Sequence, residues 1–211
     1  EELPVQVKEH QDAAQAAIRE SNLDLARQQY QAIIQAFPDT EYALDAQREI
    51  TRTFVWQGDD AGTDAGLDQL MTTFASQQNA TKSIDSIAQQ LIYANKVDKS
   101  KAVYEEALTK MSSHPNRIWL DCGIVKYYFA KKDFVQGQAE FAKFWDNNVN
   151  HPELVAVTMD IAGGCHALGA LEQFQTICDM ILAEFPNHPL AFDVLAGKVN
   201  GYMRARDVAS A

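Results

Sequence analysis

The chain has 211 residues, of which 46% are hydrophobic and 22% are charged, and its formal net charge is −11. This composition excludes a disordered or fibrous protein, and the negative charge opposes binding to nucleic acid or to anionic membrane surfaces. No segment reaches the roughly 18 apolar residues that a membrane-spanning helix needs, so we expect no membrane insertion.

Three His-Pro pairs are spaced 37 residues apart, at His114, His151 and His188. The pair Phe37-Pro38 likewise recurs as Phe185-Pro186, four periods later. A fixed period of about 20–50 residues is typical of repeat proteins, in which each unit buries its apolar side chains against its neighbours. We therefore expect a chain of about five repeats, each 37 residues long.

Two amphipathic helices are predicted in each repeat. When the repeats are aligned, the second half of each one carries apolar residues at positions i, i+3 and i+4, which lie on one face of an α-helix. The first of these positions holds Tyr30, Leu67, Tyr104, Phe141 and Cys178. The first half of each repeat shows the same spacing around Ala14, Thr51, Ala88, Val125 and Ala162. The pattern predicts eleven helices, which are five antiparallel pairs and an unpaired last helix.

In chain order, the predicted repeats span 5–38, 39–75, 76–112, 113–149 and 150–186, and the last helix spans 188–206. The prolines of the His-Pro pairs suit the first turn of a helix, with the histidine as the preceding cap residue. No linker rich in Pro, Gly or Ser divides the chain. The prediction is therefore one all-α domain over 1–211, a right-handed α-α superhelix.

Four residues of the first repeat form a known pattern. Small residues stand at Ala14 and Ala26, an aromatic residue at Tyr30, and a proline at Pro38. This pattern resembles the tetratricopeptide repeat (TPR) family, and the segment 23–38 is similar to the repeats of its bacterial cell-envelope members. Later repeats depart from the pattern, since Phe174 replaces the small residue in the fifth repeat and the period is 37, not about 34. The resemblance implies a divergent TPR-like solenoid.

The TPR resemblance also implies a binding surface, because the first helices of such arrays line a concave groove. The groove-facing positions that it implies are Lys8, Gln11, Gln15 and Ile18; Asp45, Arg48, Arg52 and Val55; Lys82, Asp85, Gln89 and Ile92; Trp119, Cys122, Lys126 and Phe129; Ala156, Met159, Gly163 and His166; and Asp193, Ala196, Asn200 and Met203. Four cations among them are expected to contact carboxylates of an extended or helical peptide: Arg48, Arg52, Lys82 and Lys126. Trp119 and Phe129 are expected to supply an apolar anchor, and His166 completes the predicted partner-binding set.

Three other motifs have both a chemical and a structural interpretation. A row of imidazoles at the His-Pro pairs could bind a divalent metal, but stacked repeats lie roughly 10 Å apart, too far for two imidazoles to share an ion. Cys165 is followed by a histidine that could act as its base, but neighbouring residues of a helix do not face each other. The segment 58–64 has a faint likeness to a calcium loop but lacks the final glutamate. The structural interpretation is preferred for each, so no catalytic, metal or cofactor site is predicted.

The cysteines and the first residues bear on the compartment. Cys122, Cys165 and Cys178 show no Cys-x-x-Cys spacing, so they are predicted to be small buried residues, not disulfide or zinc ligands. The chain begins Glu1-Glu2-Leu3-Pro4, without an initiator Met or a signal segment, as a processed exported protein or a trimmed one does. An exported or periplasmic location is slightly favoured over a cytoplasmic one.

These features favour a non-catalytic protein-interaction scaffold that binds a protein or peptide, of acidic character, in the groove. One alternative is a structural, self-associating module of a larger assembly, or a fragment of a longer repeat protein. Its basis is the last helix, where Leu195, Val199 and Tyr202 have no following helix to cover them, so a homo-oligomer could form there. A second alternative is a divergent enzyme, which would need a deep pocket with convergent polar groups.

Overall fold

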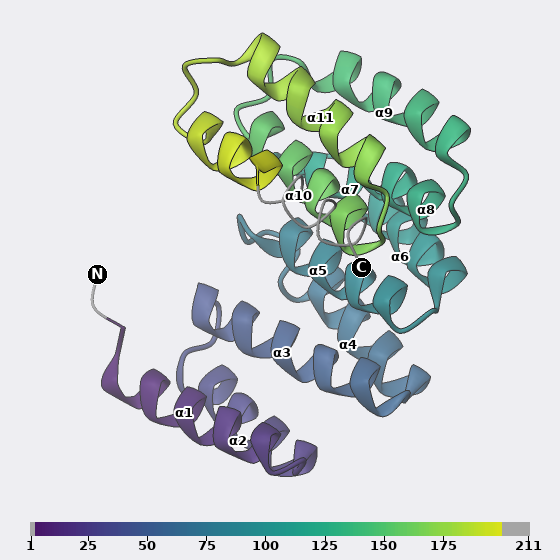
Figure 1. Cartoon of the computed structure of the whole chain (residues 1–211). Helices are drawn as coiled ribbons and strands as arrows, with labels where there is room; N and C mark the ends of the chain where they lie inside the picture. The colour runs from purple at the N-terminus through teal and green to yellow at the C-terminus, as the bar shows by residue number, and fades with distance from the viewer. Residues whose placement is uncertain (1–2, 200–211) are drawn as a thin grey trace, which may run out of the picture. The chain divides into compact units, whose positions relative to one another are not determined.

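The computed structural model describes residues 3–199, which fold into helices and connecting turns (Figure 1). The helices are α1 (Val5–Arg19), α2 (Leu23–Ala36), α3 (Glu41–Gln57), α4 (Asp60–Thr72), α5 (Ala80–Tyr93), α6 (Val97–Lys110), α7 (Ile118–Asp121), α8 (Gly123–Ala130), α9 (Phe134–Asn148), α10 (Leu154–Ala167) and α11 (Leu171–Glu184). Residues 191–199 are also helical, and no strand occurs between residues 3 and 199. The all-α prediction is confirmed.

The helices pair as the repeats predict. α1 packs against α2, α3 against α4, α5 against α6, α8 against α9, and α10 against α11. The first helix of the fourth repeat is interrupted at Cys122, which separates α7 from α8. If α7 and α8 are counted as one interrupted helix and residues 191–199 as the last, the described residues contain the eleven predicted helices. The predicted end of the last helix, 200–206, lies outside the described residues.

Contacts along the backbone divide the chain into two bodies. The N-terminal body extends to Leu120 and the C-terminal body begins at Asp121, so the boundary falls in the interrupted helix. The prediction of one continuous right-handed superhelix over 1–211 depends on the arrangement of the two bodies, and it stays a prediction.

In the N-terminal body, consecutive pairs stack on one another. α2 packs against α3, α3 against α5, and α4 against both α5 and α6. One core cluster gathers side chains such as Ala14 and Tyr30 from the first repeat, and a second gathers Leu70, Ile84 and Leu91 from the next two. Each fully buried Leu or Ile contributes about 1.5–3 kcal/mol, so the stacking of apolar faces stabilises the body.

The aligned positions of the second helices are buried as expected. Tyr30, Leu67, Tyr104, Phe141 and Cys178 each expose no more than 5% of their surface. The hydroxyl of Tyr104 keeps a partner inside the core, because it donates a hydrogen bond of 2.7 Å to a carboxylate oxygen of α5. The 37-residue period therefore reflects equivalent packing positions in both bodies.

The turn inside every helix pair contains one residue in the left-handed conformation, with φ between 60° and 76°. These residues are Ser21, Gly58, Asn95, Lys132 and Gly169, again spaced 37 apart. In each turn, two N–H groups bond back to the last carbonyls of the first helix. The Gly58 N–H donates to the Val55 carbonyl at 3.1 Å, and the next N–H to that of Phe54 at 3.0 Å. This is the Schellman arrangement, which ends one helix and reverses the chain into the next.

The His-Pro pairs form turns just ahead of a helix. In each turn, the histidine Nδ1 accepts a hydrogen bond of 3.1 Å from the N–H two residues later, as at His114, His151 and His188. The following helices begin two or three residues after the proline, at Ile118, Leu154 and residue 191. The placement of the prolines inside the first helical turn is therefore wrong. The proline occupies the second position of a turn, which its fixed φ favours.

Candidate functional site

A pocket of about 410 Å³ opens between α1 and α3 in the N-terminal body. We call it the first-helix pocket. It is lined by Gln11, Gln15, Ile18, Arg19, Tyr30, Asp45, Ala46, Arg48, Glu49, Arg52 and Trp56. Six of these residues occupy groove-facing positions implied by the TPR resemblance. The structure therefore brings six of the eight predicted groove positions of the first two repeats together around one hollow, and leaves out Lys8 and Val55.

Two arginines of the pocket are held by one glutamate. Glu49 lies between Arg48, whose Nε is 3.4 Å from its carboxylate, and Arg52, which also pairs with it. Arg48 makes a second ion pair with Asp45, at 2.9 Å. Because the Glu49 side chain is only 14% exposed, it restrains both guanidinium groups. The positions of these cations are thus set before any partner arrives.

Burial changes the acid–base behaviour of the pocket wall. Burial raises the pKa of Asp45 above its ordinary value, while the neighbouring Arg48 works in the opposite direction. Burial likewise raises the pKa of Tyr30, and the charge of Glu49 adds to this effect. The phenol therefore stays neutral at physiological pH.

Trp56 forms one edge of the pocket and is 46% exposed. The guanidinium carbon of Arg52 lies 4.6 Å from the centre of the indole ring, a cation–π contact. The indole N–H points to the Gln90 side-chain oxygen on α5 at 3.4 Å. An exposed aromatic ring is therefore held in place beside the arginines.

The predicted residues of the third and fourth repeats lie differently. Lys82 is exposed on α5, and its ammonium nitrogen lies 4.8 Å from the centre of the Trp119 ring. Trp119 itself is only 5% exposed. The expectation that this ring is an accessible anchor is wrong, because the ring is buried while Lys82 beside it is exposed.

In the C-terminal body, the predicted residues also serve packing. Lys126 on α8 is 6% exposed and pairs with Asp160 on α10. Phe129 is 2% exposed and lies so close to Gly137 that an added Cβ there would come within 2.6 Å of its ring. Phe129 is therefore not an accessible anchor. His166 is half-buried, with its ring edge-on to that of Phe174 at 5.2 Å.

A second hollow of about 370 Å³ opens between α2, α3 and α4. Its lining includes four glutamines, together with Arg27 and Phe54. The Arg27 guanidinium lies 4.4 Å from the centre of the Phe54 ring and donates hydrogen bonds of 3.0 Å to Thr53 and Gln57. Because the Arg27 side chain is only 14% exposed, it is less accessible to a ligand than Arg48 and Arg52, whose side chains are 30% and 32% exposed.

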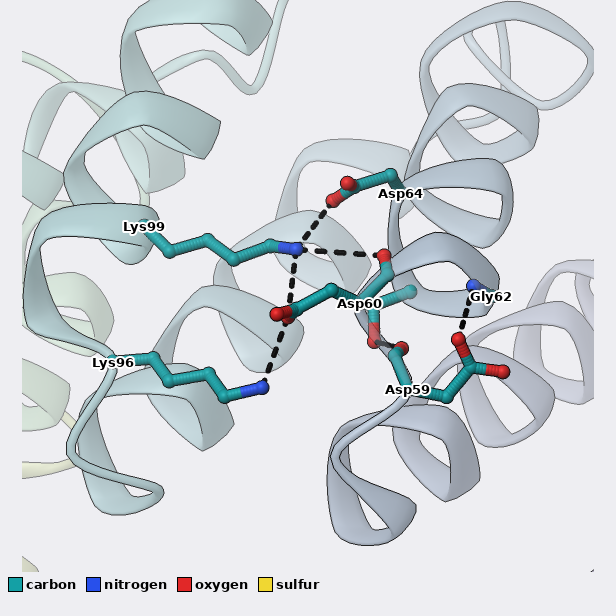
Figure 2. A network of polar contacts seen from close by, with 7 residues as sticks. Asp59, Asp60, Gly62, Asp64, Lys96 and Lys99 are labelled. Atoms are coloured by element: carbon teal, nitrogen blue, oxygen red, sulfur yellow. Dashed lines mark hydrogen bonds and ion pairs between the residues drawn. The ribbon is translucent and has the colours of Figure 1, made fainter.

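The carboxylates of the calcium-like segment 58–64 form a helix cap and ion pairs with lysines. Figure 2 shows that the Asp59 carboxylate accepts a hydrogen bond from the Gly62 N–H, at 2.9 Å, and so caps α4. The Asp60 carboxylate pairs with Lys96 and Lys99 of the next repeat, both at 2.9 Å (Figure 2). Hydrogen bonds from these lysines hold the pKa of Asp60 below its ordinary value. The segment joins α4 to the following helix pair.

All three cysteines are free and buried, and the pKa of two of them is raised. Burial raises the pKa of Cys165 to about 12 and that of Cys178 to about 11. A thiolate is needed for nucleophilic attack or metal binding, so neither residue is activated at neutral pH. No group of three metal-binding side chains was found within residues 3–199, and no helix in this range is long and apolar enough to span a membrane.

The structure identifies two exposed aromatic residues that the groove positions implied by the TPR resemblance do not include. Val55 and Ile92 were expected to face the groove, but they are only 4% and 8% exposed. The next residues, Trp56 and Tyr93, are 46% and 52% exposed. Trp56 and Tyr93 are 37 residues apart, at equivalent positions that follow Arg19. The recurrence of a large aromatic residue after 37 residues, directly after an apolar position, was the sequence signal that could have revealed them.

No protein-family model and no curated protein matches this sequence. Among solved structures, the chain is similar to a putative kinesin light chain from Podosopora anserina, described as having nearly identical TPR-like repeats. The match covers 87% of this chain and 96% of that chain, with 15% sequence identity and a TM-score of 0.45.

Proposed function

We propose that this protein is a non-catalytic interaction scaffold, and that the first-helix pocket binds an acidic segment of a protein partner. The observation that carries the proposal is the pair Arg48 and Arg52, oriented by a shared glutamate at the wall of an open pocket. Guanidinium groups fixed in this way bind carboxylates without losing much conformational entropy.

The charge of the pocket supports an acidic partner. Its lining holds three arginines against two carboxylates, which leaves one net positive charge, whereas the whole chain has a formal charge of −11. Arg19 is exposed at the rim. An acidic segment would be repelled by most of the surface and attracted only within about one Debye length of this pocket, roughly 8 Å at physiological salt. The local charge thus selects where such a segment binds.

The proposed surface is smaller than the predicted groove. Arg48, Arg52 and the exposed Lys82 remain in it, all on the first helices of the N-terminal body. Lys126, Trp119 and Phe129 are left out because they are buried, with 6%, 5% and 2% of their surface exposed, whereas the Arg48 and Arg52 side chains are 30% and 32% exposed. His166 is left out because its ring packs against Phe174.

The test combines affinity capture with charge removal. The wild-type protein and the double variant Arg48→Gln/Arg52→Gln are used as baits in lysate of the source organism, at low and high salt. Lys143→Gln, which removes an exposed cation of α9, is the matched control. We expect a partner that is retained by wild type and by the control but lost with the double variant and at high salt. A partner retained equally by all three baits would contradict the proposal.

Self-association is a second candidate function, favoured by the last described helix. Phe192, Leu195 and Val199 are 76%, 49% and 49% exposed, and their spacing places them on one face. A contact between two copies would bury this face. Sedimentation of the wild type and of Leu195→Glu at several concentrations tests it. A monomer at every concentration would refute self-association, and a dimer lost in the variant would support it.

A further inference from the structure

Two exposed aromatic residues lie at the ends of successive first helices, and we call them the aromatic ledge. They are Trp56 at the end of α3 and Tyr93 at the end of α5. α3 and α5 pack against each other within the N-terminal body, and the two residues occupy equivalent positions in consecutive repeats. Trp56 also lines the first-helix pocket, and Tyr93 is the equivalent residue on the next first helix.

The Trp56 ring of the ledge is held in position before binding. The Arg52 guanidinium stacks on the Trp56 ring at 4.6 Å, and the indole N–H contacts Gln90 of the neighbouring helix at 3.4 Å. A large ring that is both restrained and exposed loses little entropy when a partner covers it. Tryptophan, tyrosine and arginine are also the residues that contribute most to binding energy at protein interfaces.

We propose that the aromatic ledge binds an aromatic side chain of the partner, next to the carboxylates that the first-helix pocket binds. This inference rests on the proposed function and specifies its partner as an acidic segment interrupted by an aromatic residue. The charge of the pocket selects the carboxylates, and the ledge offers a flat apolar surface of matching shape. The shared Arg52 links the two parts, since its guanidinium lines the pocket and covers one side of the indole.

The test uses three blocked pentapeptides as probes. Glu-Glu-Phe-Glu-Glu has both features, Glu-Glu-Ala-Glu-Glu has only the charges, and Gln-Gln-Phe-Gln-Gln has only the ring. Binding to the whole chain is measured by NMR titration, with the indole signal of Trp56 assigned from a Trp56→Phe variant. We expect the first peptide to bind about tenfold more tightly than either of the others and to shift this signal.

Variants separate the two parts of the site. Trp56→Ala/Tyr93→Ala should weaken the first peptide to the level of the alanine peptide and leave the alanine peptide unchanged. Arg48→Gln/Arg52→Gln should weaken both acidic peptides. Val135→Ala, which shortens a side chain of the C-terminal body that is 82% exposed, is the control outside both proposed surfaces and should change none of the three affinities.

Each contrary result has a distinct meaning. If both acidic peptides bind equally and depend on the arginines, the ledge has no role, but the proposed function stands. If neither acidic peptide shifts the signals of Arg48 and Arg52, the pocket itself is wrong. A Trp56 signal that moves with protein concentration alone would show that a second copy covers the ledge, which would overturn the inference.

Discussion

Replacing Gly58 with alanine tests whether the left-handed turn residues control the repeat. Gly58 adopts φ 73° and ψ 15° at the end of α3. A Cβ added there would meet no atom within 4 Å, so the variant introduces no clash. The substitution therefore isolates the backbone cost of the left-handed conformation, which glycine avoids.

The expected loss of stability follows from two opposing effects. A side chain in the left-handed region costs roughly 1–2 kcal/mol. Alanine also restricts the unfolded chain, which returns about 0.4–1 kcal/mol. We therefore expect Gly58→Ala to lower the free energy of unfolding of the N-terminal body by about 1 kcal/mol.

Gly163→Ala makes the same chemical change with the opposite expected sign. Gly163 is exposed inside α10, and a Cβ there would also meet no atom within 4 Å. Since glycine is about 1 kcal/mol less favourable than alanine inside a helix, this variant should stabilise the C-terminal body by about that amount.

Native-state hydrogen exchange measures both effects, because it reports the opening free energy of each body from its own amides. The amides of α3 should exchange about fivefold faster in Gly58→Ala, which corresponds to about 1 kcal/mol. Exchange no faster than in the wild type would refute the turn argument for Gly58→Ala. Destabilisation by Gly163→Ala would contradict the helix-propensity argument.

Three further predictions concern packing, pH and thiol reactivity. Gly137→Ala should destabilise the C-terminal body by about 1–3 kcal/mol in a urea titration, because its Cβ would lie 2.6 Å from the buried Phe129 ring. Asp60→Asn should be less stable than wild type at pH 7. Because hydrogen bonds from the two lysines lower the pKa of Asp60 below 3.8, the stability that its ion pairs contribute is present above that pH and is lost as the pH falls through the folded pKa. A variant as stable as the wild type at pH 7 would contradict the ion-pair network. Cys165 and Cys178 should react with a thiol reagent at pH 8 only as fast as the body opens, since burial raises their pKa to about 12 and 11; rapid labelling of the folded protein would contradict their burial.

Much of the fold could be predicted from the spacing of apolar residues. Positions i, i+3 and i+4 define one face of a helix in any context, so the aligned column from Tyr30 to Cys178 predicted buried second-helix positions, and all five are buried. The helix pairs and their order followed from the 37-residue period. The five left-handed turn residues from Ser21 to Gly169 share the same period, but only two of them are glycine, so residue type alone does not identify these turns.

The exposed face of the first helices could not be obtained in the same way. Neighbouring positions in a helix differ by about 100° in direction, so a one-residue error exchanges a buried Val55 for an exposed Trp56. Which side chain is covered depends on how closely the next helix approaches. The same applies to Trp119 and Phe129, which have the composition of a binding anchor but lie in the interior.

Local periodicity by itself therefore determined the helices, their pairing and the repeat length, because these depend on the period of apolar residues along one chain. The tertiary structure was needed for contacts between residues far apart in sequence. It shows that Glu49 orients two arginines around a pocket formed with α1, and that Asp60 forms ion pairs with two lysines of the next repeat. Distances across packed helices set these contacts, and no spacing along the chain encodes them.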